Sequence, residues 1–157
     1  MSSPRLETLI ARLEKGHRKT LETLSQLSPE GWQQIIYHEQ DWTVQDLLAH
    51  FVAAENYLRD VAQNVAAGGP GAPQDFDLDA INERARAQLA DRSPQQLLAD
   101  LDQARQRTLV LVRTLDDGQL HNTGRHPGLG GVNLETMILS LYGHQLLHMR
   151  DLQARMK

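Results

Sequence analysis

Hydrophobic residues recur at three- and four-residue intervals along several long stretches of the chain, which is the period of an amphipathic helix. The first stretch covers about residues 4–27 and begins with Pro4, a residue that suits the first turn of a helix. The second begins at Thr43, which with Asp46 three residues later resembles a capping box, and it ends at the glycine- and proline-rich residues 68–73. Both stretches are predicted to be long helices with one apolar face.

The second half of the chain shows three more helical patterns. Residues 77–89 form a weaker one that is rich in Ala and Arg. Ser93 and Pro94 are typical of an N-cap and a first helical residue, and they start another long helix. Asn133 suits the N-cap of a last helix, which is predicted to extend to about residue 156.

These elements are typical of one fold class. Four long helices and one short one, joined by long connections such as the glycine-rich loop at residues 123–132, indicate a bundle with at least one crossover. The hydrophobic content of 40% is dominated by Leu and Ala and only 4% of residues are aromatic, which favours helices over a β-sandwich. We therefore predict an all-α four-helix bundle without a β-sheet, formed as a single domain by residues 1–157.

Charge and composition exclude several functions. The formal net charge is −4 and the Lys and Arg residues are not clustered, which argues against a nucleic-acid partner. No stretch without a charged residue, 136–149 included, reaches the ~18 apolar residues that a membrane-spanning helix needs, so no membrane partner is expected. The N-terminal residues lack the apolar segment of a signal peptide and the chain has no Cys, which is typical of a cytoplasmic protein.

Two histidines lie one turn apart in the last predicted helix. Met137, Leu141, His144 and His148 follow one another at steps of four, three and four residues, which places them on one inward-facing stripe. Imidazoles at positions i and i+4 are close enough to bind one metal ion. The alternative is that both histidines have only a structural role in the core. Each would then place a polar ring in an apolar layer, which is unfavourable without a hydrogen-bond partner. The pair alone leaves both interpretations open, and it lacks the Glu of the HExxH metalloprotease pattern.

His50 lies at the edge of the apolar face of the second predicted helix. A third imidazole from a neighbouring helix would complete a three-histidine site with one open position, which is the pattern of catalytic rather than structural metal sites. Glu55 and Tyr57 follow His50 on the same helix, and His126 lies in the glycine-rich loop. These three residues are candidates for transferring a proton, although each also has an ordinary packing role as its alternative.

Other polar and aromatic residues have simpler interpretations. His17 is predicted to be a partly buried polar residue on the first helix, and Trp42 to anchor the start of the second. Arg105 and Arg107 are predicted to lie in solvent. None of these four residues is expected to carry out chemistry.

Two segments resemble a known family. Residues 41–50, DWTVQDLLAH, resemble the W-[ST]-x3-L-x2-H helix start of the DinB/YfiT-like superfamily, and residues 126–130 and 143–148 resemble its C-terminal half. The resemblance covers essentially the whole chain. It implies a four-helix bundle that frequently dimerises and that holds a divalent metal ion, often nickel or zinc. By this resemblance the metal ligands are His50, His144 and His148.

Two functions from different classes remain open. Characterised relatives in this family include thiol-dependent isomerases, S-transferases and hydrolase-like proteins. The first hypothesis is therefore a metal-dependent enzyme, a hydrolase or thiol S-transferase, that activates water or a low-molecular-weight thiol for attack on an electrophilic small molecule. Any thiol would be a co-substrate, since the chain has no Cys. The alternative is a non-catalytic, metal-stabilised, stress-related binding bundle, and an open metal site would favour the enzyme.

Overall fold

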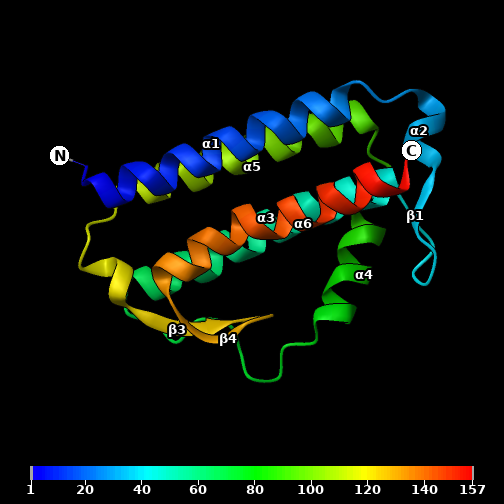
Figure 1. The fold of residues 1–157 in the computed structure, drawn as a ribbon. Helices are drawn as coiled ribbons and strands as arrows, with labels where there is room; N and C mark the ends of the chain where they lie inside the picture. The colour runs from blue at the N-terminus through cyan, green and yellow to red at the C-terminus, as the bar shows by residue number, and fades with distance from the viewer. Residues whose placement is uncertain (1, 157) are drawn as a thin grey trace.

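Four long helices make up the body of the structure, a computed structural model that describes residues 2–156. They are α1 (Pro4–Ser25), α3 (Val44–Ala66), α5 (Pro94–Arg113) and α6 (Leu134–Arg155). The connections contain α2 (Pro29–Gln33), α4 (Leu78–Gln88) and the 3-10 turn η1 (Gln119–His121). The predicted four-helix bundle is confirmed (Figure 1). None of the helices within residues 2–156 combines the length and apolarity needed to cross a bilayer.

The starts of the long helices follow from their caps. Each helix is preceded by a residue whose side chain accepts a hydrogen bond from the backbone N–H three residues on: Ser3, Thr43, Ser93 and Asn133. These bonds satisfy amide groups that have no partner inside the helix. Thr43 and Asp46 form the predicted capping box, which fixes the start of α3 only six residues before His50.

The order of the helices in the bundle requires a crossover. Both α1 and α3 pack against α5 and α6. Helices α1 and α6 run in one direction and α3 and α5 in the other, so α3 and α5 are parallel neighbours (Figure 1). A connection between parallel neighbours must return along the length of the bundle. Residues 67–93, which include α4, make this return and confirm the predicted crossover.

Two short β-hairpins correct the prediction of no β-sheet, and one of them replaces the loop predicted at residues 123–132. β1 (Ile35–Tyr37) pairs antiparallel with β2 (Trp42–Thr43), and β3 (Thr123–His126) with β4 (Gly130–Asn133). Strands this short cannot show a two-residue alternation in the sequence. Gly124 lets the second hairpin pack directly on α3, because a Cβ there would lie 2.4 Å from Val65 Cγ2.

The core consists of one apolar cluster toward each end of the bundle, with a polar layer between them. Arg105 lies in this layer and is 1% exposed, which corrects the prediction that it is solvated. Its Nε and Nη2 donate to the Glu55 carboxylate at 2.6 and 3.0 Å, and it also donates to the carbonyl oxygens of Leu13 and Leu141. One side chain of α5 therefore contacts the other three long helices. Arg107, in contrast, is exposed as predicted.

Candidate metal centre

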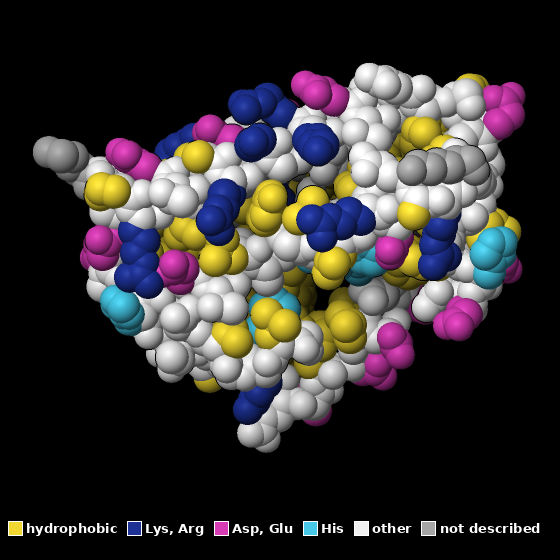
Figure 2. All heavy atoms as spheres, viewed as in Figure 1, with side chains coloured by type: hydrophobic (Ala, Val, Ile, Leu, Met, Phe, Trp, Pro, Cys, Tyr) yellow, Lys and Arg dark blue, Asp and Glu magenta, His cyan; other side chains and the backbone are white. Residues whose placement is uncertain are grey.

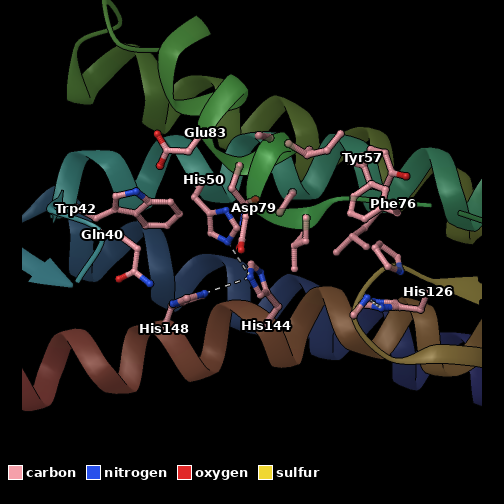
Figure 3. Close-up of a pocket in the computed structure, with 18 of the residues that line it drawn as sticks. Gln40, Trp42, His50, Tyr57, Phe76, Asp79, Glu83, His126, His144 and His148 are labelled. Carbon is pink, nitrogen blue, oxygen red and sulfur yellow. Dashed lines mark hydrogen bonds between the residues drawn. The ribbon is translucent and has the colours of Figure 1, made fainter. Parts of the chain in front are cut away.

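Three histidine side chains from two helices converge on one point (Figure 3). His50 comes from α3, and His144 and His148 come from successive turns of α6. His144 Nε2 lies 2.9 Å from His50 Nε2 and 3.2 Å from His148 Nε2. The potential ligand atoms of the three residues all lie within 4.8 Å of one another. The structure thus brings together the three histidines singled out in the sequence.

The spacing of these nitrogens suits a single metal ion. Ligand nitrogens ~2.0–2.1 Å from an ion lie about 3.3 Å apart in tetrahedral geometry and about 2.9 Å apart when the bonds are at right angles. The observed separations of 2.9 and 3.2 Å span these values. Hydrogen bonds between the rings explain these short distances less well. A ring nitrogen carries either one proton or one lone pair, so His144 Nε2 can form a hydrogen bond to only one of the two neighbouring histidines.

Burial favours the neutral form of all three imidazoles. Burial and, to a lesser extent, the neighbouring His148 lower the pKa of His50 to about 4. The pKa of His144 falls to about 3 through burial and the nearby histidines. Burial also lowers the pKa of His148, although the Asp151 carboxylate opposes this shift. Since a metal ion binds the neutral imidazole, the cluster is ready to act as a ligand set at neutral pH.

A hydrogen-bonded chain orients the ring of His148. Tyr37 Oη lies 2.7 Å from His148 Nδ1 and donates its own proton to Asp151 at 2.7 Å. His148 Nδ1 must therefore donate to Tyr37, which leaves the lone pair of this imidazole on Nε2, toward the other two histidines. Burial and the bond to Asp151 raise the pKa of Tyr37, so the phenol stays protonated. Partners of this kind commonly fix the tautomer of metal-binding histidines.

A pocket of about 530 Å³ opens beside the three histidines. The middle of α3 forms one wall, α4 and the residue Phe76 form another, and the turn after β3 closes the far end (Figure 3). Aromatic rings form much of the lining: Trp42 packs 5.2 Å from the His50 ring, and Tyr57 packs 4.9 Å from Phe76. A mostly apolar cleft of this size suits a small organic molecule.

The three candidates for proton transfer lie in different places. Glu55 is 1% exposed and bound to Arg105, and it does not line the pocket. His126 lines the far end, where its Nδ1 accepts from the backbone amides of residues 128 and 129 and its Nε2 contacts Ser140 Oγ at 2.9 Å. Both nitrogens are thus occupied. Tyr57 also lines the pocket, beside Phe76 and away from the histidine cluster (Figure 3).

Several residues of the site were missed in the sequence. Tyr37 lies in a hairpin that the pattern did not reveal, so its approach to His148 is a tertiary contact without a local signal. Asp151 carried one usable signal, because it follows His148 by three residues and so lies on the same side of α6. Asp79 and Glu83 line the pocket from α4, and nothing in the sequence placed that helix beside the histidines.

The chain resembles known proteins in sequence profile and in structure. A sequence profile of the DinB superfamily matches residues 12–152. The structure resembles YfiT from Bacillus subtilis, which is described as a probable metal-dependent hydrolase with an unusual four-helix bundle topology. The TM-score is 0.75 and the sequence identity is 21%, and the match covers 99% of this chain and 90% of the YfiT chain. It also resembles TT2238, described as a four-helix bundle protein, with a TM-score of 0.62 and 24% identity over 95% and 98% of the two chains. A search of curated proteins finds no significant match. Because the profile covers most of its length, this chain belongs to the DinB superfamily.

Proposed function

We propose that this chain is a metal-dependent hydrolase of small molecules whose divalent metal ion, zinc or nickel, is held by Nε2 of His50, His144 and His148. The observation that carries the proposal is the convergence of three neutral imidazoles at the wall of a 530 Å³ pocket. A bound ion supplies Lewis acidity, which lowers the pKa of water and polarises a substrate oxygen. The likeness to YfiT, described as a probable metal-dependent hydrolase, supports the same reaction class.

The protein residues around the site have separate tasks. Tyr37 and Asp151 hold the His148 ring in the tautomer that presents Nε2 to the ion. Trp42 and the Tyr57–Phe76 pair form apolar walls that bind the hydrocarbon part of a substrate and displace water from the cleft. These contacts position a reacting bond beside the three nitrogens rather than taking part in the reaction.

The proton released from the attacking nucleophile needs an acceptor. Glu55 is committed to Arg105, and both nitrogens of His126 are occupied. Asp79 and Glu83 on α4 are the two carboxylates that line the pocket among the described residues. Since a carboxylate that reaches the nucleophile can accept its proton, we assign this task to Asp79 or Glu83 in place of the candidates taken from the sequence.

The site assignment is tested by measuring bound metal in single variants. We expect His50→Ala, His144→Ala and His148→Ala each to lose most of the metal found in the parent protein by elemental analysis. The exposed His38→Ala and His121→Ala serve as matched controls and should keep it. If the three variants bind metal as the parent does, the assignment is wrong. If metal loss also removes the helical circular dichroism signal, the non-catalytic, metal-stabilised alternative is favoured.

The choice between a hydrolase and a thiol transferase needs an activity assay. Hydrolysis of activated ester and amide substrates should depend on the metal and should not require an added thiol. A reaction that occurs only with a low-molecular-weight thiol would overturn the hydrolase and favour the S-transferase. Homodimer formation also stays a prediction, and sedimentation at micromolar concentration tests it.

A further inference from the structure

A second cavity lies between α1 and α6, apart from the histidine centre. Its volume is about 520 Å³, close to that of the first. The α6 residues that line it include Gln145, Met149 and Arg150, and none of the three histidines does so. At 100° per residue, Gln145 and Met149 project about 100° around α6 from His144 and His148. The two cavities share no lining residue and are therefore separate sites on different faces of one helix.

The rim of this second cavity is strongly basic. Arg12, Lys15 and Lys19 of α1 and Arg150 of α6 line it, and no Asp or Glu among the described residues does so. None of these four cations forms an ion pair within residues 2–156. Figure 2 shows several blue side chains over α1 and α6 on this face. Four free cations at one cavity stand out in a chain whose net charge is −4.

The floor of the cavity offers polar groups without protein partners. Gln145 and Thr20 are each 5% exposed, and neither side chain makes a hydrogen bond to the residues that the structure describes. The Gln145 amide and the Thr20 hydroxyl therefore have hydrogen-bonding capacity that no protein group uses and that a molecule in the cavity can take up. At one side, Gly16 lets the Tyr142 ring approach α1, because a Cβ would lie 2.8 Å from Tyr142 Cδ2.

We propose that this cavity binds a small phosphorylated molecule. Its phosphate groups would contact Arg12, Lys15, Lys19 and Arg150, and a neutral polar part would contact the Gln145 amide and the Thr20 hydroxyl. Arg and Lys side chains are the usual partners of phosphate oxygens. A cleft of about 520 Å³ suits a small molecule rather than a nucleic-acid backbone, which needs an extended basic surface.

The test is a titration of the full chain with inorganic pyrophosphate at 150 mM salt, followed by ¹H–¹⁵N NMR. We expect saturable shifts of the Gly16 and Thr20 backbone amides and of the Gln145 side-chain amide. Lys15→Gln together with Lys19→Gln should weaken binding at least tenfold, because two direct phosphate contacts are lost. The control removes the same charge outside the cavity, at the exposed residues Arg18 and Arg107, both changed to Gln.

The control should change affinity less than twofold, since neither residue lines the cavity and no direct phosphate contact is lost. An equal loss in both double variants would overturn the proposal and show attraction to net charge alone. Shifts confined to residues 126–129 would overturn it as well, by placing the anion in the first pocket. Shifts of the α1 and α6 amides with protein concentration alone would identify the groove as an interface between two copies. These outcomes are independent of whether the protein is a hydrolase.

Discussion

Replacement of Glu55 by Gln should destabilise the protein strongly without touching the pocket. The side chains of Glu55 and Arg105 are each 1% exposed, so the substitution leaves a guanidinium charge buried with only an amide and two carbonyl oxygens as partners. Breaking a buried ion pair on one side typically costs 3–5 kcal/mol. For a chain of this size each kcal/mol lowers the melting temperature by roughly 2–4 °C, so a fall of about 6–20 °C is expected.

Urea unfolding followed by circular dichroism at 222 nm measures this change. The matched control is Arg107→Gln on the same helix, which removes an exposed charge and should alter the free energy of unfolding by less than about 0.5 kcal/mol. The double variant Glu55→Leu with Arg105→Met should recover most of the loss, because it removes both charges and fills the space with apolar atoms. Recovery would show that the cost arises from an unpaired buried charge rather than from altered packing.

A loss below about 1 kcal/mol in Glu55→Gln would refute this reasoning. If Glu55→Gln keeps its stability and its metal but loses activity, Glu55 would instead be the proton-transfer residue considered in the sequence analysis. A large loss of stability in the control would show that α5 is sensitive to any change of charge.

Three further predictions concern the site, the pH and the packing of α1. Tyr37→Phe should weaken metal binding by roughly 10–100-fold with unchanged helicity, measured by competition with a chelator, because it removes the partner that orients an imidazole ligand. The metal-free protein should lose stability as the pH falls below ~6.5, because His144 has a folded pKa of about 3 and takes up its proton more readily when unfolded. This residue alone contributes about 2 kcal/mol to the loss at pH 5, and urea unfolding that is constant from pH 7 to pH 5 would contradict the expectation. Gly16→Ala should destabilise by roughly 1–3 kcal/mol through its contact with Tyr142, whereas Gly143→Ala, which meets open space in α6, should stabilise by up to about 1 kcal/mol. Thermal unfolding of the two alanine variants tests this opposite pair.

Sequence patterns predicted the features that depend on neighbours along the chain. The long helices follow from apolar periodicity, and their starts follow from caps such as Thr43 with Asp46. The spacing of His144 and His148 needs only the geometry of one helix. Each of these inferences uses residues that lie within one or two turns of each other.

Features that depend on a distant partner were not predicted. Arg105 was expected in solvent because Arg is rarely buried, and its partner Glu55 lies fifty residues earlier on another helix. The hairpins were missed because their strands are too short for a pattern. Tyr37 approaches His148 only because the β1–β2 hairpin lies against α6, a contact that no local pattern encodes.

The wall of the pocket formed by α4 has a consequence for how this fold can diversify. No side chain of α4 is buried, although Asp79 and Glu83 line the pocket. Substitutions at exposed positions usually change stability by less than about 0.5 kcal/mol, so this wall can vary without endangering the bundle. The histidine-bearing helices, in contrast, also carry the core and tolerate little change. Relatives that share the three histidines can therefore change the lining of this pocket by substitutions in the crossover while the histidines and the core stay the same.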